Sequence, residues 1–137
     1  MDATELASIH AACFQTPRPW SATEFDALLA SKGVFICTAR DGFIMGRIVA
    51  DEAELLTIAV LPRARRNGIA TTLMRAFDAH LNSHNVSEVF LEVSSENQGA
   101  IALYHRFNFD MAGTRKGYYQ TPDLRKIDAL VMRKVIL

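Results

Sequence analysis

The sequence predicts a single α+β domain, residues 1–137, built around a mixed sheet. Three strand-like runs between Val34 and Leu61 are joined by short turns, which form an antiparallel meander because they are too short for crossovers. A strand, a helix and a second strand follow over residues 55–93, which is the pattern of a βαβ unit with parallel strands. No linker, repeat or low-complexity tract divides the chain.

Two helices are predicted before the sheet. Residues 3–14 carry apolar side chains at helical spacing. A second helix begins at Ser21, because a serine followed three residues later by Glu24 forms a capping box, and Gly33 ends it.

The meander needs two turns. The pair Asp41-Gly42 is a strong hairpin signal, and residues 51–53 form the second turn. The acidic residues Asp51, Glu52 and Glu54 are most simply a solvated turn. Strands are expected over residues 34–40, 43–50, 55–61, 86–93, 109–118 and 127–135, and the two later helices over residues 68–84 and 97–107.

Composition excludes several classes of protein. Lysine plus arginine equals aspartate plus glutamate, 15 of each, so there is no general attraction to nucleic acid or to an anionic membrane. The cysteines lack metal-ligand spacing, and His80 and His84 lie one helical turn apart without an evident third ligand, so no metal is expected. No segment resembles a signal peptide or a membrane span. We therefore expect a cytoplasmic protein.

The most informative stretch, Arg65 to Thr71, follows a buried strand and opens a helix. The first turn of a helix has N–H groups without intrahelical partners and carries partial positive charge, so it binds anions. Gly68 and the small Ala70 allow a ligand to approach the backbone closely, and two arginines add charge. A pyrophosphate fits such a site, although an isolated motif of this kind also occurs in ordinary loops.

The motif and its surroundings resemble the GNAT superfamily of N-acetyltransferases. There a hydrophobic strand, like residues 55–62 here, precedes the pattern Q/R-x-x-G-x-G/A, like residues 65–70 here, and residues 91–109 resemble the family's next strand and helix. Similarity to the RimI-type ribosomal-protein-alanine N-acetyltransferases lies in Pro19-Trp20-Ser21, Gly117-Tyr118-Tyr119 and Asp128-Ala129. The resemblance implies the acyl-CoA N-acyltransferase fold: a mixed, mostly antiparallel sheet that splays between two parallel middle strands, with helices on both faces.

The resemblance also implies acetyl-CoA as the acetyl donor, with no metal. The residues that it assigns to the donor are Ile58, Ala59 and Val60 for the pantetheine arm, Arg66, Asn67, Gly68, Ile69, Ala70 and Thr71 for the pyrophosphate, and Asn97 on the second helix. By residue type Asn97 is equally a helix N-cap. Asn108 stands where the family usually has glycine, and we expect a positive φ there, which asparagine tolerates.

The chemistry requires a base and an acid, because an amine attacks a thioester only when neutral and the leaving thiolate needs a proton. The family pattern gives the base role to Glu92, which strand alternation directs away from Leu91 and Val93, into a slot with few solvent contacts. It gives the acid role to Tyr104. The alternatives are a solvated glutamate and a tyrosine that packs in the core.

The resemblance implies a protein N-terminus as the acceptor, possibly the N-terminal alanine of a ribosomal protein. Tyr118 and Tyr119 lie in the segment similar to the family's substrate-side loop, although a strand-end aromatic pair is an alternative. Two other functions stay open: acetylation of a small-molecule amine, and a non-catalytic acyl-CoA-binding module. An open cleft flanked by this tyrosine pair and by the loop of residues 121–125 would favour a peptide acceptor, and a closed pocket would favour a small amine.

Overall fold

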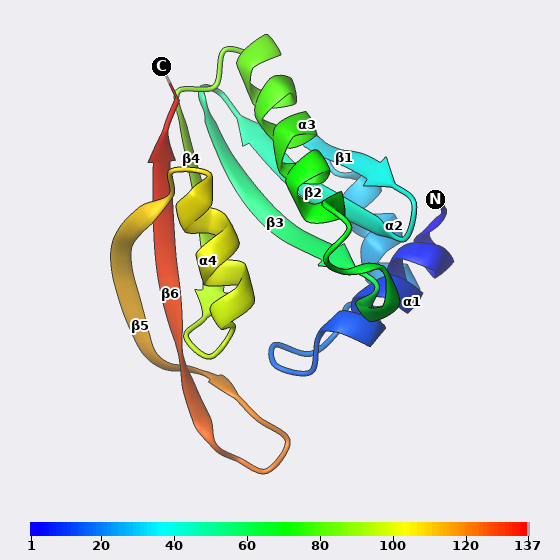
Figure 1. Ribbon diagram of the computed structural model, residues 1–137, viewed down its shortest axis with the longest axis vertical. Coiled ribbons are helices and arrows are strands. Elements are labelled where there is room, and N and C mark those ends of the chain that lie inside the picture. The colour runs from blue at the N-terminus through cyan, green and yellow to red at the C-terminus, as the bar shows by residue number, and fades with distance from the viewer. Residues whose placement is uncertain (137) are drawn as a thin grey trace.

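A computed structural model describes residues 1–136 and shows a six-stranded sheet with helices on both faces (Figure 1). Its helices are α1 (Ala3–Cys13), α2 (Ala22–Ala30), α3 (Ile69–Ser83), α4 (Gln98–Arg106) and the short 3₁₀ helix η1 (Pro62–Ala64). Its strands are β1 (Val34–Ala39), β2 (Gly42–Val49), β3 (Glu52–Val60), β4 (Glu88–Ser94), β5 (Asp110–Gln120) and β6 (Lys126–Val135). Each predicted helix and strand is therefore present, with ends that shift by a few residues.

The caps of the first two helices follow from sequence. The Asp2 side chain accepts a hydrogen bond from the backbone N–H of Glu5, which starts α1. The predicted capping box of α2 is confirmed: Ser21 accepts from the Glu24 N–H, and the Glu24 carboxylate accepts from the Ser21 N–H.

The sheet splays between its two middle strands. The strand order is β1-β2-β3-β4-β6-β5, and only β3 and β4 run parallel. These two strands pair at three positions near their starts, the last being Glu54 with Phe90, and then diverge. The predicted mixed, mostly antiparallel and splayed sheet is confirmed, and its open end points toward the starts of α3 and α4 (Figure 1).

Two hydrophobic clusters hold the layers together. On one face α3 and α4 pack through residues such as Phe77 and Leu103, and on the other face α1 and α2 pack through residues such as Leu6 and Phe25. Strand β3 contributes to both clusters because its side chains alternate between the two faces, and a bulge changes which positions face α3. Met45 pairs with Thr57 and Gly46 with Leu55, so Leu56 is an extra residue.

The turns of the meander differ from prediction. The first turn is Arg40-Asp41, with Asp41 at a φ of 65°, and Gly42 already lies in β2. The second turn is Ala50-Asp51, and Glu52 and Glu54 belong to β3 rather than to a solvated turn. In β3 the alternation of exposed and buried side chains begins before the apolar run, because the exposed Glu52 and Glu54 flank the buried Ala53.

Candidate active site

The divergence of β3 and β4 leaves one edge of β3 without a strand partner. Beyond Glu54, β3 pairs only with β2, so the backbone of residues 55–60 faces the gap between the two halves of the sheet. An unpaired strand edge offers N–H and C=O groups to an extended chain that carries amides. This property supports the role that the resemblance gave to Ile58, Ala59 and Val60.

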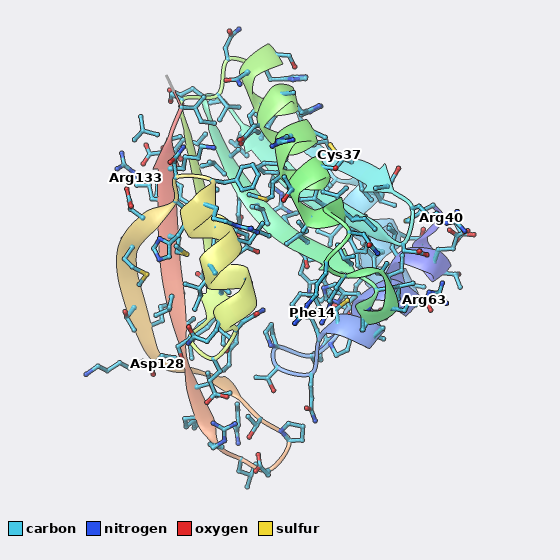
Figure 2. All side chains as sticks on the ribbon, viewed as in Figure 1. Phe14, Cys37, Arg40, Arg63, Asp128 and Arg133 are labelled. Atoms are coloured by element: carbon cyan, nitrogen blue, oxygen red, sulfur yellow. The ribbon has the colours of Figure 1, made fainter. Side chains whose placement is uncertain are left out.

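A cavity of about 1040 Å³, open on one side, lies at the end of this gap. Its walls come from the end of β3, the starts of α3 and α4, the loop after α1 and the tip of the β5–β6 hairpin. Figure 2 shows Phe14, one of its lining residues, where α1 ends. The predicted donor residues that line the cavity are Ile58, Ala59, Val60, Arg66, Ala70 and Asn97. The others, Asn67, Gly68, Ile69 and Thr71, lie in the turn that carries Arg66 and Ala70.

The start of α3 fits the pyrophosphate of a nucleotide cofactor. Among the four α-helices of residues 1–136, α3 alone has no side-chain cap, because its N-cap is Gly68 at a φ of 75°. A Cβ added to Gly68 would meet nothing within 4 Å, so the backbone is open to a ligand. The first amides of α3 are thus free donors at the positive end of the helix dipole, beside Arg66.

Arg65 has a role that the sequence reasoning missed. Its Nε donates to the carbonyl oxygen of Val60 at 3.1 Å, and the thiol of Cys13 donates to the same oxygen at 3.2 Å. These bonds fasten the turn before α3, and the end of α1, to the last residue of β3. No local pattern signals them, because Cys13 lies 47 residues from its partner.

Asn97 has one of its two expected roles, that of a helix N-cap. Its Oδ1 accepts from the backbone N–H of Ala100 at 3.2 Å, so it is the N-cap of α4. It also lines the cavity, which leaves its amide N–H groups near any ligand there.

The expectation that Glu92 has few solvent contacts is wrong. Its side chain is 31% exposed and forms an ion pair with Arg115, with 3.3 Å between Oε1 and Nε. Glu92 does point away from Leu91 and Val93, as alternation predicted, and both of these neighbours are buried. It lies against a second, smaller hollow of about 330 Å³, on the sheet face opposite α3 and α4. Glu92 is exposed because α1 and α2 cover only the part of that sheet face that β1, β2 and β3 form.

Tyr104 is a buried residue of α4, 5% exposed, with its ring edge-on to Phe109 at 5.8 Å between centroids. Tyr104 therefore packs in the core, as the alternative interpretation expected. Burial, and secondarily the nearby Tyr119, raise the pKa of Tyr104 far above that of a free phenol. A phenol in this setting stays protonated at neutral pH and is able to donate a proton.

Tyr118 and Tyr119 lie outside the large cavity, on the β5 side of Glu92. Their rings meet edge to face at 5.4 Å between centroids, and the Arg115 guanidinium lies 5.1 Å from the Tyr118 ring. Burial and then the charge of Glu92 raise the pKa of Tyr119, and Tyr118 raises it further, against the effect of Arg115. Tyr119 thus lies close enough to Glu92 for that charge to raise the pKa of Tyr119, and close enough to Tyr104 to raise the pKa of Tyr104.

Two further expectations from the sequence concern metal ions and membranes. Within residues 1–136 no group of three or more histidine, cysteine, aspartate or glutamate side chains could hold a metal, and His80 and His84 stack on each other at 4.2 Å. In the same residues, none of the helices has the length and apolar character needed to cross a bilayer.

The loop of residues 121–125, which the sequence analysis placed beside a possible cleft, lines the cavity through Thr121, Pro122, Asp123 and Arg125. Arg125 forms an ion pair with Glu96, which ties the hairpin tip to the loop before α4. The sequence reasoning missed Gln15, Thr16 and Arg106, which also line it, because these residues lie in segments far apart in sequence.

Comparison with known proteins agrees with this geometry. Residues 3–109 match the Acetyltransferase (GNAT) family. The ribosomal protein bS18-alanine N-acetyltransferase of Escherichia coli (strain K12) is 34% identical, covering 83% of this chain and 79% of that protein. The N-alpha-acetyltransferase RimI of Mycobacterium tuberculosis is 32% identical, covering 97% of this chain and 86% of its own length.

Solved structures show the same likeness. The crystal structure of the ribosomal-protein-S18-alanine N-acetyltransferase from Escherichia coli has a TM-score of 0.86 at 29% identity, covering 98% of this chain and 87% of that one. Arabidopsis thaliana NAA60 in complex with acetyl-CoA shares the fold, with a TM-score of 0.83 at 20% identity and coverage of 98% and 93%. A splayed sheet with an uncapped helix start beside it, together with matches over most of the chain, places this protein in the Acetyltransferase (GNAT) family, as an acetyl-CoA-dependent N-acetyltransferase.

Proposed function

We propose that this enzyme acetylates the N-terminal α-amino group of a protein, and that the acceptor is the N-terminal alanine of a small-subunit ribosomal protein. The observation that carries the proposal is that Glu92 lies partly exposed beside an open hollow of about 330 Å³, outside the cavity that contains the predicted donor residues. An open cleft admits an extended chain, whereas a small amine is better held by an enclosed pocket. The relatives named as acting on protein bS18 or as N-alpha-acetyltransferases support the same acceptor class.

The acetyl donor is proposed to lie along the unpaired edge of β3. The backbone of Ile58, Ala59 and Val60 would bind the pantetheine arm, and the turn from Arg66 to Thr71 would bind the pyrophosphate. Asn97 would contact the donor through its free amide N–H groups. The donor supplies an activated carbonyl carbon in a thioester.

Glu92 and Tyr104 are proposed to move the protons of the reaction. The acceptor ammonium loses a first proton to Glu92, directly or through a water molecule, and the neutral nitrogen then attacks the thioester carbonyl to form the new C–N bond. As the C–S bond breaks, the hydroxyl of Tyr104 gives its proton to the sulfur, and the second proton that the nitrogen loses returns through solvent to the Tyr104 oxygen. Burial raises the pKa of Tyr104, so its hydroxyl carries a proton at neutral pH, and the same shift makes it a weaker acid than a free phenol. Arg115 fixes the position of the Glu92 carboxylate through their ion pair.

An acceptor panel tests the proposed function. Purified enzyme and acetyl-CoA are combined with peptides that begin with alanine, the same peptides with blocked N-termini, small amines, or no acceptor, and thiol release is followed. We expect release only with the free N-terminus, and mass spectrometry should place the acetyl group on the α-amino nitrogen. Turnover confined to small amines would refute a protein acceptor, and cofactor binding without any turnover would indicate a non-catalytic module.

The role of Glu92 is tested with a control from the same strand. Glu92→Gln should lower kcat by about a hundred-fold or more, which is typical for loss of a general base, with little change in the KM for acetyl-CoA. Glu88→Gln is the matched control, because Glu88 is also a β4 glutamate paired with an arginine, Arg133, near the far end of the strand. Equal losses in both variants would remove Glu92 from the mechanism.

A further inference from the structure

The ladder between β5 and β6 is interrupted beside the candidate active site. Arg115 pairs with Ala129, and the next pair is Tyr119 with Ile127, so three residues of β5 lie opposite Asp128 alone. A regular ladder would place Tyr119 opposite Arg125, at the hairpin tip. The bulge therefore brings Tyr119 back by two positions, about 7 Å along the strand, toward Glu92.

Asp128 supplies the hydrogen bond that the bulge would otherwise lose. A bulge leaves backbone N–H groups without a ladder partner. Here the N–H of Gly117, which has a φ of 59°, donates to Oδ1 of Asp128 at 2.8 Å. Figure 2 shows Asp128 on β6 beside the point where β5 bends.

The backbone of Asp128 is joined to the other side of the site. Its carbonyl oxygen accepts from the N–H of Ser95 at 2.9 Å, directly after β4 ends. One residue thus connects the end of the strand that carries Glu92 with the bulge on the strand that carries Tyr119.

Side chains next to the bulge reach Glu92 through direct contacts. Arg115, the last regular residue before the bulge, pairs with Glu92 at 3.3 Å. The same guanidinium lies over the ring of Tyr118, which in turn packs edge to face on Tyr119. A shift of the bulge would therefore move both tyrosines and the arginine that holds Glu92.

We propose that Asp128 is a positioning residue for the acceptor side of the active site. Its carboxylate holds the bulge of residues 116–118, and the bulge in turn sets where Tyr119 and the Arg115–Glu92 pair lie. Asp128 acts through Gly117 and needs no contact with either substrate. The inference rests on the proposed function, since it takes Glu92 as the place where the acceptor amine loses its proton.

Three variants test this inference in the acetyl-transfer assay. Asp128→Ala should lower kcat/KM for the acceptor peptide by about ten- to a hundred-fold, the usual effect of losing a hydrogen bond to a charged group, and leave the KM for acetyl-CoA unchanged. Asp128→Asn keeps an oxygen acceptor and should restore most of the activity. Asp110→Ala is the matched control: Asp110 is an exposed aspartate on β5, and no hydrogen bond of its side chain is found among residues 1–136.

Hydrogen exchange of the Gly117 amide gives a readout that does not depend on activity. The amide should be protected in the wild type and in Asp128→Asn, and should exchange at least ten-fold faster in Asp128→Ala. If Asp128→Ala does not fold, Gly117→Ala serves instead, because alanine is strained at this φ, and it should show the same selective loss for the acceptor.

Two results would overturn the inference. One is an equal loss in the Asn and Ala variants, which would mean that charge rather than the hydrogen bond matters. The other is an unprotected Gly117 amide in the wild type. Absence of acetyl transfer in the wild type with a protected amide would instead refute the proposed function and leave the role of Asp128 in the bulge intact.

Discussion

At the scale of single residues, Tyr104 is buried in the core, with its ring against Phe109. Tyr104→Phe keeps the ring that packs on Phe109 and removes only the hydroxyl. We expect kcat to fall by about a hundred-fold, as for the loss of a general acid, while the KM for acetyl-CoA stays near its wild-type value. Steady-state kinetics of the two proteins measures this.

The pH profile gives a second check on Tyr104. Its pKa is raised, so ionisation of this hydroxyl should not lower kcat of the wild type anywhere below about pH 10. A wild-type decline near pH 8 that is absent in Tyr104→Phe would contradict the raised pKa.

His10 links pH to stability at the same scale. It is 2% exposed, its Nδ1 accepts from the Trp20 N–H at 3.0 Å, and its Nε2 lies 3.1 Å from the Thr57 hydroxyl. Burial lowers its pKa to about 4, against a smaller opposing effect of Glu24. The folded chain therefore binds a proton less readily than the unfolded chain does, and the stability that His10 contributes is present above pH 6.5 and declines as the pH falls toward 4.

Between pH 7.5 and pH 5 this decline should be about 2 kcal/mol. We expect the difference in free energy of unfolding between the wild type and His10→Phe, measured by urea denaturation, to fall by that amount over this pH range. A constant difference for His10→Phe would show that His10 titrates alike in both states.

At the scale of elements, the start of α3 joins stability to donor binding. Gly68→Ala should cost about 1–2 kcal/mol, because alanine is strained at a φ of 75°, and should raise the KM for acetyl-CoA by disturbing the free amides. Gly113→Ala is the matched control, since Gly113 is also exposed with open space around it but has no positive φ. Thermal unfolding and kinetics measure the two effects, and equal losses in both glycine variants would contradict this account.

The same scale shows what sequence could predict. The capping box of α2 and the positive φ of Asn108, observed at 70°, each follow from residues that are adjacent in sequence. Strand pairing is less local. The extra residue Leu56 in β3 and the three-residue bulge of β5 depend on which residue lies opposite, and period-two patterns do not encode that.

For the whole molecule, the site is predictable only in part. The turn that opens α3, which we propose binds an anion, is a contiguous motif, so the sequence alone identifies its residues. The alternation of β4 predicts where Glu92 points but not its exposure. The surroundings of Glu92 come from β5, whose Arg115 lies 23 positions away, and from the face that α1 and α2 leave open. The sequence does not indicate that Arg65 and Asp128 hold two segments together, because their hydrogen-bond partners lie in other strands.

Because β3 and β4 pair at only three positions, few backbone hydrogen bonds join the two halves of the sheet. Among residues 1–136, one ion pair links the two halves. Asp78 of α3 accepts from Lys134 of β6 at 2.9 Å, and the Lys134 side chain is only 12% exposed. The α3 helix packs on β1, β2 and β3, so this pair ties the first half of the sheet to the second. Because Oδ1 of Asp78 is buried without a partner, the carboxylate depends on Lys134 for compensation.

Removing one of the two charges should therefore lower the free energy of unfolding more than removing both. Lys134→Met and Asp78→Leu should each destabilise the fold by about 1–2 kcal/mol, since each leaves a partly buried charge unpaired. The double variant should recover at least about 1 kcal/mol of the summed loss, which urea denaturation of all four proteins measures as a coupling free energy. Additive losses would mean that solvent already compensates both charges, and that this pair does not stabilise the joint between the two halves of the sheet.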